Sequence, residues 1–155
     1  MTEIVANLFV KAQEGASFPA DISLVVQDEH RDFLVPILVV KLVVGTPKES
    51  SRRLEELTDM IRSQTRRGKR VLTVPGRGFT GVAAVLACYL VRFTDMGAGR
   101  CLRIVEELTD GALLSLDGFR AAFVHFFAHV VLKEREHRRT RHNESSGCSL
   151  KSCFE

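Results

Sequence analysis

The segment from residue 71 to residue 92 constrains the fold more than any other part of the chain. An apolar, β-rich run over residues 71–74 enters residues 76–81, a loop in which three of six residues are glycine, and an apolar run over residues 82–92 follows. This order predicts a strand, a tight loop and a helix. Backbone N–H groups of such a loop converge with a helix N-terminus on one point, a geometry that can hold a phosphate. The loop contains no cysteine, histidine or lysine, and its one arginine is Arg77.

The rest of the chain alternates short apolar runs with amphipathic segments. Runs rich in Val, Ile and Leu predict buried strands, whereas apolar residues at three- and four-residue spacing among charges predict helices. Continuous apolar strands separated by helices are typical of a parallel sheet covered on both faces. We therefore expect an α/β fold with a mostly parallel central sheet flanked by helices. The expected strands cover residues 3–10 (with a break near residues 6–7), 22–26, 33–44 and 71–74, and the expected helices cover residues 48–67, 80–92, 96–108 and about 113–138.

Length and composition favour a single intracellular domain. Hydrophobic residues make up 45% of the 155 residues and charged residues 26%, as in an ordinary globular protein. The longest apolar run, residues 33–44, is too short to span a membrane, and the first residues lack the basic start of a signal peptide. Cys88 and Cys101 lie in apolar helical patterns, which favours buried free thiols and a reducing compartment, cytoplasmic or cytoskeletal.

The excess positive charge lies near the C-terminus. Residues 133–142 hold five Lys/Arg against two Glu, and this balance by itself equals the net charge of +3 of the whole chain. A basic segment of this kind can bind an acidic protein surface or another anionic surface, and nothing in the sequence favours nucleic acid. We expect a domain over residues 1–139 and a polar, mobile tail over residues 140–155. The predicted partner-binding residues are Lys133, Arg135, Arg138, Arg139 and Arg141.

The glycine loop also fits a Gly-x-Gly-x-x-Gly motif, formed by Gly76, Gly78 and Gly81. Between a strand and a helix, that motif is the dinucleotide-binding fingerprint. The fingerprint also needs a second strand that ends in Asp or Glu about 20 residues further on, and here residues 97–108 are predicted to be helical. Bulky Phe79 would crowd a pyrophosphate. A dinucleotide site is therefore a distant alternative.

Residues 72–81, Leu-Thr-Val-Pro-Gly-Arg-Gly-Phe-Thr-Gly, resemble the loop His-Cys-x-x-Gly-x-x-Arg-Ser/Thr-Gly of the cysteine-dependent dual-specificity phosphatases. Gly76, Thr80 and Gly81 match that loop. Residues 3–10 resemble the opening strand of the family, and residues 43–47 fall where the family has its acid loop. A helix at residues 101–108, the Gly-Ala-Leu-Leu-Ser segment that follows it, and a long helix with a basic end resemble the phosphatase-of-regenerating-liver branch. The resemblance covers about residues 3–140 and implies a protein tyrosine phosphatase-like fold.

The resemblance also implies which chemistry has been lost. The nucleophilic cysteine corresponds to Thr73 and its neighbouring histidine to Leu72, the phosphate-clamping arginine corresponds to Phe79, and the general acid corresponds to Val43 or Val44. Each loss normally costs orders of magnitude in rate. We therefore predict a catalytically inactive pseudophosphatase that acts by binding protein partners, as a regulator or as a structural subunit of a larger assembly.

Two alternatives concern what the remaining loop can bind. Its backbone N–H groups could still hold an anion weakly and make the chain a reader of phosphate or phosphoproteins, whereas Phe79 could instead fill the old pocket. The residues of that weak anion site would be Gly76, Arg77, Gly78, Thr80 and Gly81.

No cofactor or metal is expected from the sequence. His125 and His129 have a metal-compatible spacing of four, but no nearby carboxylate or cysteine completes a site. Cys153 is third from the end rather than fourth, so the prenylation signal of the regenerating-liver branch is not met. Acylation of Cys148 or Cys153 beside the basic segment would allow peripheral membrane association. The magnesium-transport mediators bound by that branch are not expected as partners, because the face that binds them is rewritten here.

Overall fold

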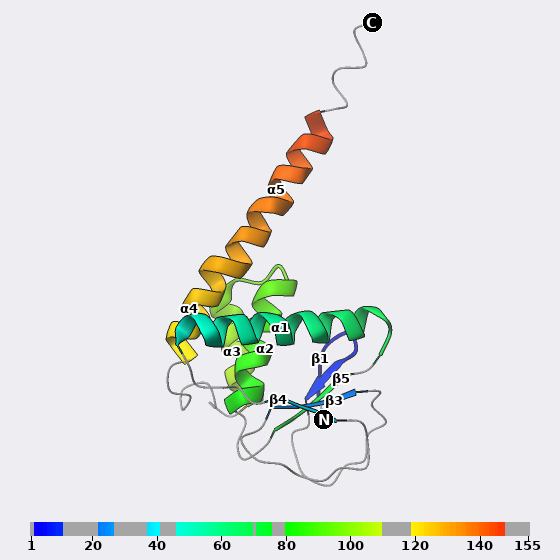
Figure 1. Ribbon diagram of the computed structural model, residues 1–155. Helices are drawn as coiled ribbons and strands as arrows, with labels where there is room; N and C mark the ends of the chain where they lie inside the picture. Colours follow the sequence, from blue (N-terminus) through cyan, green and yellow to red (C-terminus); the bar gives the residue numbers. More distant parts are fainter. Residues whose placement is uncertain are drawn as a thin grey trace, which may run out of the picture.

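A computed structural model describes residues 2–10, 22–26, 37–40, 46–69, 71–75, 80–109 and 119–147 of the chain. It is an α/β structure with five strands and a set of helices in the described ranges (Figure 1). The strands are β1 (Thr2–Val5), β2 (Leu8–Val10), β3 (Ile22–Val26), β4 (Ile37–Val40) and β5 (Val71–Pro75). The helices are α1 (Pro47–Arg66), α2 (Thr80–Phe93), α3 (Ala98–Leu108), α4 (Phe119–Phe126), the π-helical η2 (Phe127–Val131) and α5 (Leu132–Gly147).

The sheet has the strand order β1-β2-β5-β3-β4 and places β5 at its centre. β1 and β2 pair in antiparallel fashion, and every other neighbouring pair is parallel. The predicted break in residues 3–10 is confirmed, because the chain turns between β1 and β2 at Asn7, whose φ of 66° lies in the left-handed region that Asn tolerates. Because only the β1–β2 pair among the described strands is antiparallel, the mostly parallel sheet expected from the apolar runs is also confirmed. Of the strand expected over residues 33–44, residues 37–40 are a strand and the others lie outside the described residues.

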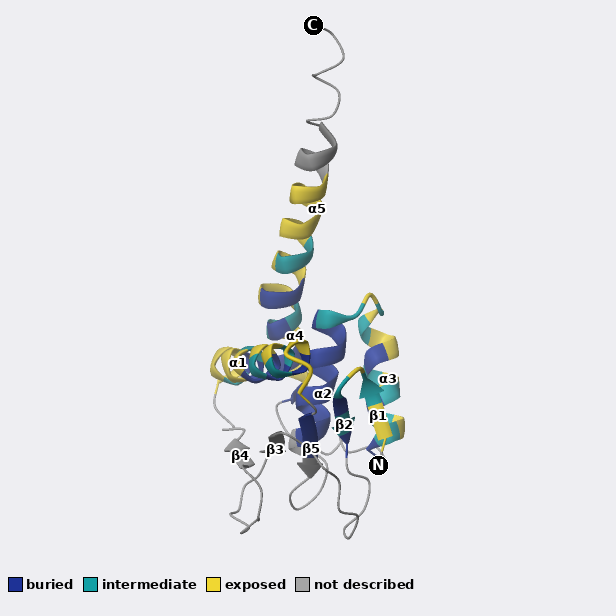
Figure 2. Ribbon diagram, turned by 90° about the vertical axis from the view of Figure 1, so that its right-hand side faces the viewer, coloured by how far each residue is buried: buried dark blue, intermediate teal, exposed yellow. Residues whose placement is uncertain are grey.

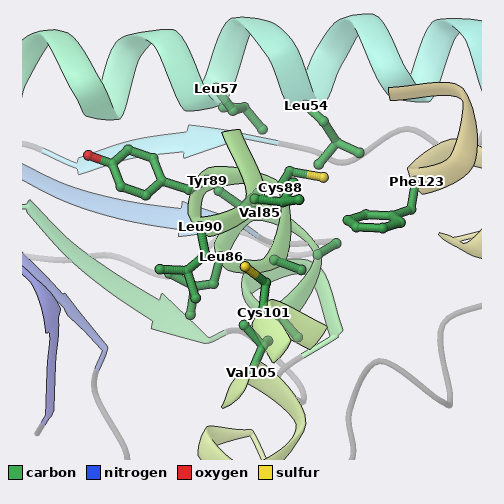
Figure 3. Packing of buried hydrophobic residues seen from close by; sticks show 14 of the residues in the cluster. Leu54, Leu57, Val85, Leu86, Cys88, Tyr89, Leu90, Cys101, Val105 and Phe123 are labelled. Carbon is green, nitrogen blue, oxygen red and sulfur yellow. The ribbon is translucent and has the colours of Figure 1, made fainter. Parts of the chain in front are cut away.

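Helix α2 forms the centre of the hydrophobic core. Every residue from Val82 to Val91 is at most 1% exposed, so this helix is buried all round, as its uninterrupted apolar sequence requires (Figure 2). Leu54 and Leu57 of α1 pack against one side of α2, and Cys101 and Val105 of α3 pack against another (Figure 3). The helix of the strand–loop–helix unit predicted from the sequence is therefore the centre of the hydrophobic core.

Helix α1 begins at a capping box and is followed by a glycine with a positive φ. Thr46 and Glu49 form a capping box, in which the Glu49 N–H donates to Thr46 Oγ1 and the Thr46 N–H donates to Glu49 Oε2. Gly68 follows the helix with a φ of 76°, a conformation that glycine adopts without strain. The helix predicted over residues 48–67, with Gly68 as its stop, is confirmed.

The C-terminal helix is longer than predicted. We expected it to end near Arg138, but α5 continues to Gly147 and projects away from the rest of the molecule (Figures 1 and 2). Residues 132–146 contain no glycine or proline, so nothing in the sequence breaks the backbone ladder where the apolar pattern ends. The predicted start near residue 113 lies outside the described residues, and α4 begins at Phe119. None of the helices in the described ranges could cross a membrane.

Candidate functional site

Thr73, which the sequence resemblance predicts to stand at the nucleophile position, lies in the middle of β5. Its register partners are Val10 on β2 and Leu24 on β3, so it has a strand on each side. The side chain is 0% exposed, and its Oγ1 donates a hydrogen bond of 2.8 Å to the Phe9 carbonyl oxygen. The Thr73 hydroxyl is therefore engaged in a hydrogen bond to the backbone of the neighbouring strand β2. Leu72 beside it is 6% exposed and offers no base.

Part of the predicted glycine-loop site is described by the structure. Thr80 is the first residue of α2 and Gly81 the second, so the helix starts where the strand–loop–helix pattern places it. The other predicted anion-binding residues Gly76, Arg77 and Gly78, together with Phe79, lie outside the described residues. Val43 and Val44 of the acid-loop position also lie outside them. The weak anion site therefore stays a prediction.

Arg92, at the end of the buried helix α2, joins three helices. Its guanidinium is 5% exposed and donates to both carboxylate oxygens of Glu134 on α5, with Nη2 2.6 Å from Oε1. Nη2 also lies 2.9 Å from Asp59 Oδ1, and Nη1 donates to Thr58 Oγ1 at 2.9 Å. Burial alone would lower the pKa of Arg92, but the hydrogen bond and charge of Glu134, followed by those of Asp59, outweigh it and raise that pKa. The cluster fixes the base of α5 against α1 and α2.

The predicted basic set on the last helix divides into two groups. Arg135 Nη2 donates to the Val91 carbonyl oxygen at 3.1 Å, and Arg138 Nη2 donates to the Arg92 carbonyl oxygen at 3.4 Å. Both acceptors are among the last carbonyls of α2, where the helix dipole favours positive charge. Arg135 is half-buried, whereas Arg138 is exposed, as are Lys133, Arg139 and Arg141. Arg135 and Arg138 therefore help to anchor α5, in addition to any role in binding a partner.

A groove of about 540 Å³ runs between α1 and the first turns of α5, and sequence reasoning missed it. Helix α1 contributes Arg62 and Arg66, which lie some 70 residues before their neighbours on α5 and belong in the sequence to an ordinary amphipathic helix. The sequence gives no signal for this groove, because the second half of α1 carries no more arginines than the first. The lining residues are Glu55, Arg62, Arg66, Phe93, His129, Val130, Lys133, Glu134, His137, Arg138 and Arg141.

The histidines and cysteines do not form a metal centre within the described residues. The rings of His125 and His129 lie 4.3 Å apart between centroids, but no group of three His, Cys, Asp or Glu side chains in the described ranges could hold a metal ion. Cys88 and Cys101 are buried free thiols, and burial raises the pKa of each. Neither thiol is thereby activated as a displaced nucleophile.

Comparison with known proteins places this geometry in a structural class. No family model matches the sequence, and no curated protein matches it. Among solved structures, the active form of Tk-PTP matches with a TM-score of 0.58 and 19% identity, over 72% of this chain and 80% of that one. Human DUSP28 matches with a TM-score of 0.57 and 19% identity, over 69% of this chain and 74% of that one. The fold is that of the protein tyrosine phosphatases. At this identity the likeness shows the fold alone, and the predicted α/β phosphatase-like fold of the dual-specificity type is confirmed.

Proposed function

We propose that this protein is a catalytically inactive member of the dual-specificity phosphatases, nearest to the regenerating-liver branch, and that it acts by binding other proteins. The observation that carries the proposal is the state of Thr73. At the nucleophile position of a protein tyrosine phosphatase fold, a buried threonine hydroxyl donates to the Phe9 carbonyl oxygen. The two buried free cysteines support an intracellular role, in the cytoplasm or on the cytoskeleton.

The chemistry of the family explains why this replacement matters. Phosphate transfer through a covalent intermediate needs a nucleophile that is deprotonated or has a base to take its proton, and Thr73 has neither a low pKa of its own nor a histidine at Leu72. The arginine clamp corresponds to Phe79, which cannot make the charge-assisted pair that binds phosphate. The general acid corresponds to Val43 or Val44. Loss of acid catalysis alone typically costs about 10²–10⁴ in rate.

The test is hydrolysis of an aryl phosphate and of phosphopeptides by the purified full chain. We expect rates at background, the same for the natural chain and for Thr73→Ala. Thr73→Cys alone should also stay at background, because the new thiol would lie in the middle of a strand with no clamp and no acid. Activity that is retained through purification and is lost in Thr73→Ala would contradict the proposal.

A second experiment tests the proposal that the protein acts by binding other proteins. A tagged full chain recovered from native cells should carry stoichiometric partner proteins, identified by mass spectrometry. If the chain is recovered alone at every salt concentration, the binding role is wrong even if the catalytic assay stays silent.

A further inference from the structure

The groove between α1 and α5 concentrates positive charge from two distant parts of the chain. Arg62 and Arg66 come from α1, and Lys133, Arg138 and Arg141 come from α5. Two glutamates also line the groove, and one of them, Glu134, already accepts hydrogen bonds from Nε and Nη2 of Arg92. The lining therefore keeps an excess of positive charge that the fold itself does not neutralise.

Several of these cations have no counter-ion within the described part of the chain. The side chains of Arg66, Lys133 and Arg141 make no hydrogen bond or ion pair with the described residues, and Arg62 Nε is buried with no hydrogen-bond partner. Like charges held close together cost free energy unless an anion joins them. An arginine donor that is buried without an acceptor is a second feature that folding leaves unsatisfied.

The groove also has an apolar component. Phe93 lines it, and its ring lies under two guanidinium groups, with the Arg62 Cζ 5.1 Å and the Arg92 Cζ 4.8 Å from the ring centroid. Val130, which is almost completely buried, also lines it. Arginine and aromatic residues are the side chains most enriched at the centres of protein interfaces.

We propose that this groove, with the exposed basic face of α5 that continues it, binds an acidic segment of a partner protein. Carboxylates of the segment would pair with Arg66, Lys133 and Arg141, and an apolar side chain of the segment would rest on the part of Phe93 that lines the groove. The inference rests on the proposed protein-binding function and names the chemistry of the partner.

A peptide fits these features better than a phosphate polymer or a lipid surface does. Glu55 within the lining repels a continuous row of phosphates, whereas a peptide can place its own carboxylates away from it. The face is a groove that contains the ring of Phe93, and a flat bilayer surface would leave that ring unused. The basic side chains of α5 lie between Lys133 and Arg141, over about 13 Å of helix, which is long enough for a short extended segment.

The experiment measures binding of a fluorescein-labelled dodecapeptide, in which Glu and Asp flank a central Leu-Phe pair, to the full chain by fluorescence anisotropy. The test variant is Arg66→Glu/Arg141→Glu, which reverses two exposed groove cations. The matched control is Arg100→Glu/Arg103→Glu, which makes the same charge change at exposed positions of α3, away from the lining residues. Circular dichroism checks that each variant is folded. If the charge reversals disturb folding, Arg66→Gln/Arg141→Gln replaces the test pair.

We expect the natural chain and the control to bind the acidic peptide alike and the test variant to bind about tenfold or more weakly, with a steep loss of affinity as salt rises. A peptide with Gln and Asn in place of Glu and Asp should not bind. Equal losses in the test and control variants would overturn the proposal, because they would indicate net charge rather than the groove. Tighter binding to phosphatidylserine vesicles or to a single-stranded RNA than to the peptide would also overturn it.

This experiment separates the two proposals. Phosphatase activity of the purified chain would contradict the proposed function and leave the peptide result unchanged. A failed peptide titration together with a stoichiometric native partner would leave the binding function in place and move the contact away from the groove.

Discussion

Glu134 and Asp59 both pair with Arg92, but in different surroundings. Arg92 is almost completely buried, and Glu134 gives it two carboxylate oxygens from a side chain that is 36% exposed. Asp59 gives one contact from a side chain that is 58% exposed. A buried charge that loses its main partner keeps its desolvation cost, whereas an exposed partner is readily replaced by water.

This difference predicts unequal costs for two similar substitutions. Glu134→Gln should lower the free energy of unfolding by about 1–3 kcal/mol, because it removes the charge that compensates buried Arg92. Asp59→Asn should lower it by no more than about 1 kcal/mol, as for an exposed ion pair. Urea denaturation followed by circular dichroism measures both. Equal losses would mean that Glu134 does not hold the Arg92 cluster together.

Glu49 makes a pH-dependent contribution to the start of α1. Its carboxylate accepts from the backbone N–H of Thr46 and also from the Thr46 hydroxyl, both at 2.9 Å, and these bonds lower the pKa of Glu49 below its usual 4.5. A carboxylate with a lowered folded-state pKa stabilises the fold above its unfolded-state pKa, and this stabilisation is lost as the pH falls through the folded-state pKa.

The expected result is an NMR-monitored pKa for the Glu49 side chain below 4.5 in the natural chain. Thr46→Val removes the hydroxyl donor but keeps the backbone donor, so the pKa should rise only part of the way to its usual value. A Glu49 pKa that is unchanged by the substitution would show that the backbone bond alone sets it.

At the scale of elements, the helices and helix ends that could be predicted are those determined by neighbouring residues in the sequence. Helix α2 follows from an unbroken apolar run, and Gly68 ends α1 because glycine readily takes a positive φ. The end of α5 was not predictable from the apolar pattern, because backbone hydrogen bonds continue through charged residues once a helix has begun. The π-helical turn Phe127–Val131 likewise has no signature in the order of its residues.

The candidate site was predictable only where it is contiguous in the sequence. Thr73 was identified because it lies inside a motif. The groove was missed because Arg62 and Arg141, far apart in the sequence, come to line one groove only in the folded structure, which no local pattern encodes. Arg135 and Arg138 were predicted as partner contacts from charge alone, and that charge does not reveal the α2 carbonyls that they also cap.

Truncation tests where the folded body ends. A chain that ends at Arg139 keeps Glu134, Arg135 and Arg138 and should melt within error of the full chain. A chain that ends at Leu132 loses all three contacts to α2 and should be less stable by about 2–4 kcal/mol, judged from the typical cost of losing several charge-assisted hydrogen bonds. Thermal denaturation measures both, and similar melting temperatures would show that the base of α5 contributes little to the fold.

At the scale of the whole molecule, helix α5 projects from the rest of the structure (Figure 2). Residues 133–142 of this helix hold five Lys/Arg against two Glu. Exposed charges of this kind mainly raise the rate of association with an oppositely charged partner, and salt screens them. Buried apolar and hydrogen-bonded contacts then determine how long the complex lasts. Arg135 and Arg138 contact α2, whereas Arg139 and Arg141 do not share these contacts. Substituting Arg139 and Arg141 therefore tests the effect of exposed charge on association without removing the contacts that hold α5.

The last prediction concerns Arg139 and Arg141, the exposed cations on the projecting part of α5. Reversing both, as Arg139→Glu/Arg141→Glu, leaves the contacts of Arg92, Arg135 and Arg138 in place, so the fold should be unchanged. The amount of partner recovered with the tagged chain should fall, and the fall should be larger at low than at high ionic strength, because the screening length shortens from about 10 Å at about 0.1 M salt to about 3 Å at about 1 M. Quantitative mass spectrometry of the recovered complex, with Arg100→Glu/Arg103→Glu as the control of equal charge change, measures the effect. Undiminished recovery of the partner would mean that the contact lies on another face, and the residues around Phe79 would then be the next to substitute.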